Sequence, residues 1–204
     1  MVALFTRLVS SEFLFSNIGR KQLRLAPRRT FSLLLIAAIL ERDTVETFLS
    51  PQTINELVPT VGRYLDQERV WVGYSRQIGW VHAMAHTADV ILEILRSSKS
   101  TEASRSHLLQ IVENALLRSR FPWSFGEDER LCTAVSSLLG GYRSLVIQHL
   151  NSLRSNVETS YKLDVIVRRN HINYLKGFLI VGYHRKDSEL VKLCEKELGH
   201  VLSD

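Results

Sequence analysis

The fold is decided by residues 79–96, which have the sequence GWVHAMAHTADVILEILR. Proline is absent from this stretch, and the serine-rich residues 97–100 follow it. Aliphatic and alanine side chains cover most of the circumference of a helix drawn through these residues. A helix with such a surface is normally enclosed by other helices. The stretch therefore predicts a buried helix, from Gly79 to Arg96, within a protein made of helices.

Helical periodicity continues on both sides of this stretch, and no segment shows the sustained alternation that is typical of strands. Helix starts recur about every 20–25 residues, and the connections between them are short. The predicted fold is therefore all-α, an array of about nine antiparallel helices in a HEAT-like α-superhelix, with a compact orthogonal helical bundle as the alternative. The other expected helices cover residues 3–15, 28–42, 50–68, 104–120, 124–140, 143–155, 157–183 and 187–201.

Two helix starts are predicted from their capping residues. Ser50 precedes Pro51, which is the usual order of a capping hydroxyl and a proline in the first turn. Pro59 is expected to kink the helix that starts there. Ser124 and Glu127 have the spacing of a capping box, which predicts another helix start.

The composition is that of an ordinary globular protein, with 45% hydrophobic and 23% charged residues among 204. No linker rich in proline, glycine or serine divides the chain, which predicts a single helical domain over residues 1–204. The longest apolar run, Phe31 to Leu40, is too short to span a bilayer and is interpreted as a buried core helix. Cys132 and Cys194 are interpreted as free, partly buried thiols in a reducing cytosol, so a soluble cytoplasmic protein is expected.

The net charge of +5 lies at the N-terminal end. One hypothesis is an anionic partner at the basic residues 7–29, and the alternative is a solvated basic face with some arginines paired to acids elsewhere. Nucleic acid is not favoured, because no aromatic residues are interleaved and no nucleic-acid-binding motif is present. A mitochondrial presequence would suit the acid-free residues 13–40, but the core-like stretch 30–40 argues against it. The bases are Arg7, Arg20, Lys21, Arg24, Arg28 and Arg29.

A polar stripe interrupts the apolar surface of the predicted helix 79–96. On a helical wheel His82, His86, Asp89 and Glu93 fall within about 60° of one another. Because an unpaired buried charge is very costly, the stripe must face a groove, a cavity or specific partners. It is interpreted as a buried polar network, with Asp89 paired to an arginine such as Arg130, or as the wall of a groove that binds a ligand. The predicted groove residues are Trp80, His82, His86, Asp89, Glu93, Asp128 and Arg130.

A metal site is the alternative interpretation of this stripe. His82 and His86 have i, i+4 spacing, and Asp89 one turn on could complete an open set of two nitrogens and one oxygen. A zincin protease is excluded because Ala83 stands where its catalytic glutamate must be. A different metal-dependent hydrolase would use Glu93 or Glu129 as its base. His149 and His171 are expected at surface or packing positions rather than as ligands.

Several sequence elements carry a resemblance. The stretch Tyr64-Leu65-Asp66-Gln67-Glu68, then Gly73-Tyr74, then Gly79 to Asp89 with its Gly-Trp-x-His-x-x-Ala-His-x-x-Asp element, resembles a bacterial family catalogued as domain of unknown function 2785. Arg29-Thr30-Phe31-Ser32 and Glu127-Asp128-Glu129-Arg130-Leu131 match further elements in the same order, so the resemblance covers about residues 10–140. It implies a helical, soluble bacterial protein whose activity is not established.

The chain departs from that family before Gly73. Val70 and Val72 stand where the family usually carries an acid and an arginine, so apolar contact would replace an ion pair. Any activity that requires those two charged groups is put in doubt.

Two functional hypotheses follow. The first is a non-catalytic helical-repeat module that binds a protein or peptide along a groove, with a buried His/Asp network and without a metal or other cofactor. The second is the metal-dependent hydrolase, with His82, His86 and Asp89 as its metal ligands. Whether the protein is an enzyme is left open by the sequence.

Overall fold

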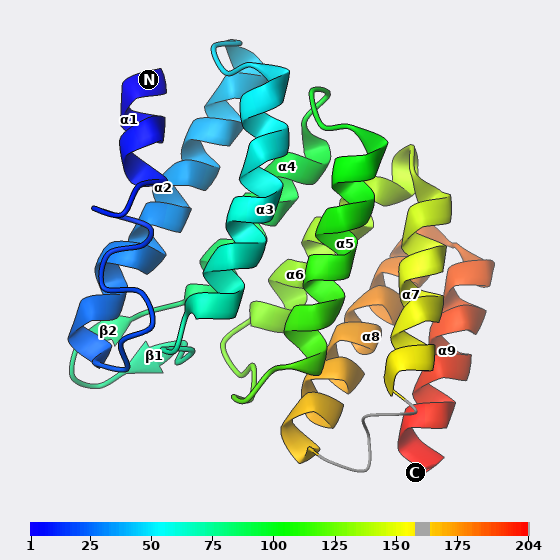
Figure 1. Ribbon diagram of the computed structural model, residues 1–204. Coiled ribbons are helices and arrows are strands. Elements are labelled where there is room, and N and C mark those ends of the chain that lie inside the picture. Colours follow the sequence, from blue (N-terminus) through cyan, green and yellow to red (C-terminus); the bar gives the residue numbers. More distant parts are fainter. Residues whose placement is uncertain (158–163, 204) are drawn as a thin grey trace. The chain divides into compact units, whose positions relative to one another are not determined.

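The computed structural model describes residues 1–157 and 164–203 (Figure 1). These residues form nine α-helices, two short 3-10 helices and one hairpin of two-residue strands, so the predicted all-α class is confirmed. The helices are α1 (Val2–Leu8), η1 (Leu23–Leu25), α2 (Ala26–Val45), α3 (Pro51–Gln67), α4 (Ala83–Arg96), α5 (Glu102–Leu117), α6 (Glu127–Ser136), η2 (Ser137–Gly140), α7 (Arg143–Val157), α8 (Val165–Arg185) and α9 (Ser188–Ser203).

The chain divides into two compact units, Met1–Leu108 and Leu109–Asp204. In the first unit, α2 and α4 pack along each other and run in the same direction. α3, which lies between them in the sequence, runs in the opposite direction (Figure 1). In the second unit, α8 packs against both α6 and α9. The alternation of direction from α2 to α3 to α4 agrees with the antiparallel order that was expected of sequential helices. The single domain and the HEAT-like superhelix remain predictions.

The start of α3 was predicted correctly from its capping residues. Ser50 has an extended backbone, and its hydroxyl oxygen accepts the backbone N–H of Thr53 over 3.1 Å. Pro51 occupies the first turn, where its missing N–H costs nothing. The helix continues through Pro59 and ends at Gln67.

The first predicted helix was too long. α1 ends at Leu8 rather than at residue 15, and turns follow it. The Ser10 hydroxyl donates to the carbonyl of Arg7 and accepts the N–H of Glu12, so it competes with the backbone bonds of a continuing helix. Asn17 then adopts a positive φ, which a helix cannot include.

Two further boundary corrections lie in the second unit. The predicted capping box at Ser124 is wrong, because α6 begins after Gly126, which has a φ of +84°, and the Glu127 carboxylate instead accepts the N–H of Phe125 over 2.8 Å. The predicted helix 157–183 corresponds to α8, which begins at Val165 after its cap Asp164. Part of that prediction, residues 158–163, lies outside the described residues.

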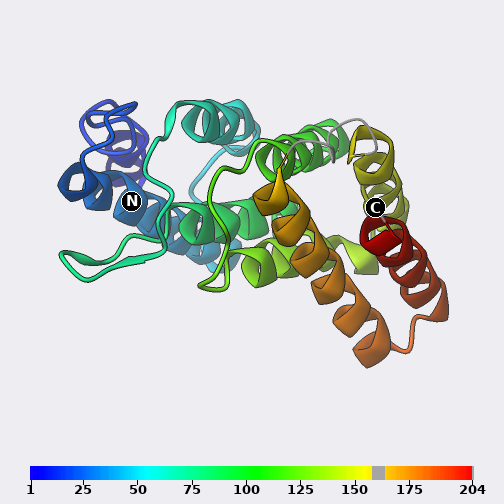
Figure 2. The ribbon, with the colours of Figure 1, turned by 90° about the horizontal axis from the view of Figure 1, so that it is seen from below.

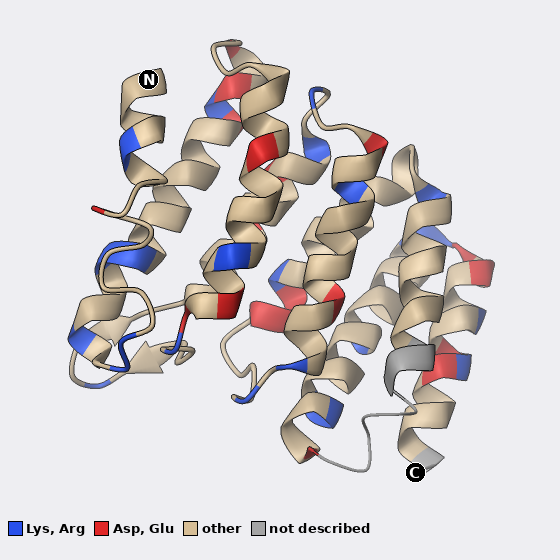
Figure 3. Ribbon diagram, viewed as in Figure 1, with Lys and Arg blue, Asp and Glu red and all other residues tan. Residues whose placement is uncertain are grey.

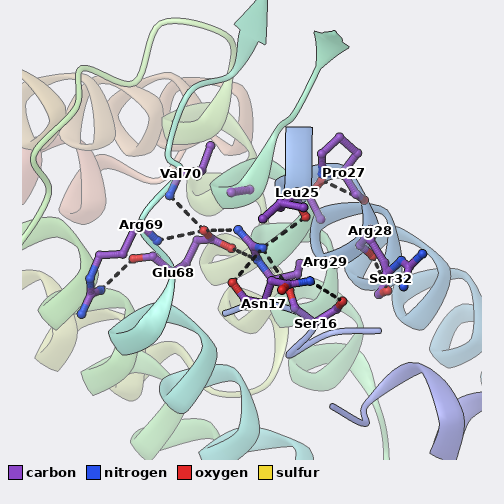
Figure 4. Close-up of polar contacts among 12 residues, drawn as sticks. Ser16, Asn17, Leu25, Pro27, Arg28, Arg29, Ser32, Glu68, Arg69 and Val70 are labelled. Atoms are coloured by element: carbon purple, nitrogen blue, oxygen red, sulfur yellow. Dashed lines mark hydrogen bonds and ion pairs between the residues drawn. The ribbon is translucent and has the colours of Figure 1, made fainter. Parts of the chain in front are cut away.

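A fully buried ion pair between Arg29 and Glu68 fastens α2 to the loop after α3 (Figure 4). Arg29 Nε donates to Glu68 Oε2 over 2.7 Å, and Nη2 donates to Oε1 over 2.8 Å. The third guanidinium nitrogen donates to three carbonyl oxygens, those of Ser16, Asn17 and Leu25. Glu68 Oε1 also accepts two backbone N–H groups, those of Arg69 and Val70. One pair of side chains therefore joins the loop before α2, α2 itself and the loop after α3.

An apolar cluster forms beside this ion pair. Val70 and Val72 pack in it with side chains from η1, from the start of α2 and from the 70–81 connection. Whether this apolar contact replaces an ion pair, as expected from the family resemblance, stays a prediction. The other members are Leu23, Ala26, Ile78 and Val81. Among the described residues, no helix has the length and apolar character needed to cross a membrane.

Candidate functional site

The stretch that predicted the fold contains a hairpin as well as a helix. Gly79 and Trp80 form strand β2 (Gly79–Trp80), which pairs antiparallel with β1 (Tyr74–Ser75). Gly79 has a φ of +80°, a conformation that suits glycine, and His82 has a left-handed backbone with a φ of +51°. Because helical φ values cannot run through these two positions, α4 begins at Ala83. The prediction of a helix from Gly79, with no strand nearby, is therefore wrong over its first four residues.

From Ala83 onward α4 is enclosed, as its composition predicted. Ten of its fourteen residues are buried, including His86. Asp89 and Glu93 are partly buried, with side chains that are 23% and 11% exposed. Three of the four predicted stripe residues thus lie on one strip of a largely buried helix, and His82 caps its start.

The polar stripe is partly paired within α4. His86 Nδ1 lies 3.2 Å from Asp89 Oδ2, and Arg96 Nη1 lies 3.7 Å from Glu93 Oε1. Burial raises the pKa of Glu93; Arg96 lowers it, while the nearby carboxylates of Glu41 and Asp89 raise it further. Glu41 belongs to α2, so three carboxylates from two helices gather beside one arginine. We call Glu41, Asp89 and Glu93 the acidic end.

Five rings in succession connect the hairpin to α4 and α2. Tyr74 meets Trp80 edge-on with 4.9 Å between centroids, and Trp80 stacks on His82 at 4.4 Å with only 5° between the ring planes. His82 then meets His86 at 5.5 Å, and His86 meets Phe31 of α2 at 5.7 Å. We call these five residues the aromatic ladder. Trp80, His82 and His86 were predicted site residues; Tyr74 and Phe31 were missed, because nothing in the sequence pairs them with the stripe.

α2 exposes apolar side chains beside the ladder. The stretch Phe31 to Leu40 was expected to be buried core, but Phe31, Leu34 and Leu35 are 43%, 38% and 51% exposed, and Ala38 is exposed as well. Their i, i+3, i+4, i+7 spacing places them on one side of the helix, while the opposite side is buried. These four residues form the α2 stripe. The α2 stripe, the aromatic ladder and the acidic end together are called the α2–α4 face.

The remaining predicted groove residues belong to the other unit. Asp128, Glu129 and Arg130 lie in the first turn of α6, where Glu129 and Arg130 are exposed and Asp128 is partly buried. The Asp128 carboxylate accepts the N–H of Glu129 over 3.0 Å, as expected of an acid at the positive end of a helix. Their predicted place in one groove with the α4 stripe stays a prediction.

Within the part of the chain that the structure describes, no group of three or more His, Cys, Asp or Glu side chains is arranged to hold a metal ion. His86 faces Asp89, but His82, His86 and Asp89 do not make such a group. The predicted divalent-metal site and its candidate bases, Glu93 and Glu129, stay predictions.

In the second unit, the titratable side chains His149, His171 and Cys132 are deeply buried. His149 Nε2 lies 3.0 Å from the hydroxyl of Tyr174, and both histidines are packing residues, which was one of the two positions expected for them. Cys132 and Cys194 are free thiols, as predicted, but they are fully rather than partly buried. Burial raises the pKa of both thiols, that of Cys194 to about 12, so neither is an activated nucleophile.

Fold and site together define a helical protein with exposed apolar side chains beside an aromatic ladder and a partly buried acidic end. Its residues 14–180 match the family described as "Protein of unknown function (DUF2785)", and the chain belongs to that family. The match confirms the family resemblance and extends beyond residue 140 into α8. The comparisons found no matching curated protein and no matching solved structure.

Proposed function

We propose that the protein is a binding module whose α2–α4 face docks an amphipathic helix of a protein partner, with a lysine or arginine near one end of that helix. The observation that carries this proposal is the α2 stripe, four exposed apolar residues at helical spacing, with Glu41 of the acidic end one turn beyond Ala38. Contiguous apolar surface on a soluble protein commonly marks an interaction site. Helix-in-groove recognition uses apolar anchors at this same spacing.

The acidic end argues for a cation on the partner. Glu93 is close to two other carboxylates, and among the described residues the cation recorded within salt-bridge distance of it is Arg96, at 3.7 Å. A lysine or arginine placed there by the partner would relieve the mutual repulsion of the carboxylates and lower the raised pKa of Glu93. Charge complementarity of this kind sets the register and direction of a docked helix.

The proposal also includes the superhelical arrangement and the cellular location that were expected from the sequence. A HEAT-like superhelix would suit a module that binds helices, because stacked helical hairpins present extended surfaces. A cytoplasmic location in a bacterium would suit two thiols that remain free.

A displayed library of random peptides of about 15 residues, long enough for about four helical turns, tests the proposal. Selected peptides should carry apolar residues at i, i+3, i+4 and i+7, followed by a lysine or arginine. Leu35→Glu should weaken their binding at least about tenfold, because it places a charge in the centre of the apolar contact. Isothermal titration with the selected peptides measures the effect.

The matched control is Ile180→Glu, which adds the same charge at another exposed apolar residue, in α8. It should leave peptide binding unchanged. Selected peptides that bind the Leu35→Glu variant as tightly as the original protein would show that the α2 stripe is not the docking surface.

The metal-dependent hydrolase makes a separate prediction. If His82, His86 and Asp89 were ligands, protein purified without chelators would carry about one equivalent of zinc, manganese, nickel or iron, and a His82→Ala/His86→Ala variant would lose it. Since binding of a helix needs no metal, we expect elemental analysis to find no stoichiometric metal in either protein. A full equivalent that disappears in the variant would replace the proposed function with the hydrolase.

A further inference from the structure

Five cationic side chains at one edge of the first unit have no partners within the described structure. Arg7 pairs with Glu12, and Arg29 with Glu68, as expected for a basic segment whose arginines meet acids. The others are exposed and make no side-chain hydrogen bond or ion pair with the described residues. They are Arg20, Lys21, Arg24, Arg28 and, from the hairpin, Arg76.

The fold brings these cations to the same edge. Leu23 of η1 and Ala26 of α2 pack against Ile78 and Val81 in the apolar cluster already described, so the segment before α2 is held beside the hairpin. Both views show the hairpin next to the start of α2 (Figures 1 and 2). No acid occurs in residues 13–40 or 69–88, and the hairpin and the start of α2 carry only basic colour (Figure 3). Both segments that form this edge therefore carry basic side chains and no acidic ones.

Two half-exposed aromatic rings lie at the same edge. Tyr74 and Trp80 are cross-strand partners in the hairpin and are 45% and 50% exposed. Tyrosine and tryptophan are the residues that concentrate at membrane interfaces, where a ring with a polar atom suits the boundary between water and acyl chains. We call Tyr74, Trp80 and the five cations the basic hairpin edge.

We propose that the basic hairpin edge binds the surface of a membrane rich in anionic phospholipids. Each lysine or arginine near such a surface is attracted to it, and two embedded rings add an apolar contribution, so the two signals together give stable but reversible attachment. Attachment is peripheral, since the contact consists of side chains of a hairpin and a helix start.

The rings favour a membrane over single-stranded nucleic acid. Proteins that bind single strands offer open ring faces on which bases stack. In this protein His82 is stacked on one face of Trp80, and Tyr74 meets Trp80 edge-on. Trp80 is thus held in a fixed orientation with one face covered, which suits insertion between lipid headgroups better than stacking with a base.

Co-sedimentation with vesicles tests the proposal on the full chain. The protein should bind vesicles of phosphatidylglycerol and phosphatidylcholine, bind pure phosphatidylcholine weakly, and dissociate at about 0.5 M salt. The affinity of the Lys21→Glu/Arg24→Glu/Arg76→Glu variant for the anionic vesicles should fall at least about a hundredfold. The control is Lys176→Glu/Lys192→Glu/Lys196→Glu, which changes net charge equally at exposed residues of α8 and α9 and should bind nearly as the original protein.

Trp80 provides a second measurement. Brominated acyl chains should quench tryptophan emission in the original protein, and most of this quenching should be lost in Trp80→Phe, which retains Trp71 and Trp123. Equal vesicle binding by the two triple variants would overturn the proposal. So would tighter binding to a labelled oligothymidine of about 20 nucleotides than to the vesicles. Leu35→Glu should bind vesicles normally, which separates this proposal from the docking of a helix on the α2 stripe.

Discussion

Replacing Arg29 with methionine is expected to lower the free energy of unfolding by about 3–5 kcal/mol, because it leaves the Glu68 carboxylate buried without its counter-charge. Both side chains are completely inaccessible to solvent. The substitution also strands three carbonyl oxygens that the guanidinium satisfies, in the loop before α2 and at its first turn. Urea denaturation followed by circular dichroism measures the loss.

The Arg29→Met/Glu68→Met double variant separates a stranded charge from lost packing. Removing both charges should cost clearly less than the sum of the two single substitutions, because neither partner is then left alone in an apolar interior. Arg42→Met is the matched control, since Arg42 also pairs with a glutamate, Glu46, over 2.6 Å, but at the surface. It should change stability little. Equal losses from Arg29→Met and Arg42→Met would contradict the role assigned to the buried pair.

The ion pair also shows what the sequence could not reveal. Ser50 and Pro51 predicted the start of α3 because a capping hydroxyl acts on a backbone N–H three residues away. Arg29 and Glu68 are 39 residues apart, and their meeting depends on how α2 and α3 pack. In the sequence Arg29 stood out as one base of the N-terminal segment and as part of the family resemblance, and Glu68 only as part of that resemblance. A local rule therefore predicted the start of α3, whereas long-range packing decided which charges are buried.

The candidate site, like the fold, was predictable from the sequence only in its local features. The enclosure of α4 follows from its composition, and the i, i+3 spacing of His86 and Asp89 brings their side chains together. The hairpin was missed because two positive φ angles, at Gly79 and His82, have no clear signal within an apolar stretch. The α2 stripe was missed for a different reason: an unbroken apolar run does not indicate which side of its helix is buried.

Lowering the pH from 8 to 5 is expected to reduce the free energy of unfolding by about 4 kcal/mol, through His149 and His171. Burial lowers the pKa of His149 to about 3, with a further contribution from the nearby His171, and burial lowers the pKa of His171 to about 4. Both rings therefore stay neutral in the folded protein at pH 5. The unfolded chain, in which both have their ordinary pKa of 6.5, takes up two protons as the pH falls.

The sign follows from this difference in bound protons. Stability contributed by the neutral histidines is complete above pH 6.5, declines as the pH falls below it, and stops declining near the folded pKa values of about 3 and 4. Between pH 6 and pH 5 the slope approaches about 2.7 kcal/mol per pH unit, since two protons are involved. Urea denaturation at a series of pH values measures this slope.

His171→Phe isolates the cause of the acid sensitivity. It keeps an aromatic ring in the buried position but removes one titrating group, so the slope between pH 6 and pH 5 should fall to about half. His184→Gln, at an exposed position near the end of α8, should leave the slope unchanged, because that side chain is in water in both states. The Asp164 and Asp187 carboxylates do not contribute to the slope between pH 6 and pH 5. Hydrogen bonds lower the pKa of each below its usual value of 3.8, which is already below this pH range. A slope that is the same in His171→Phe and in the original protein would show that acid sensitivity arises elsewhere in the chain.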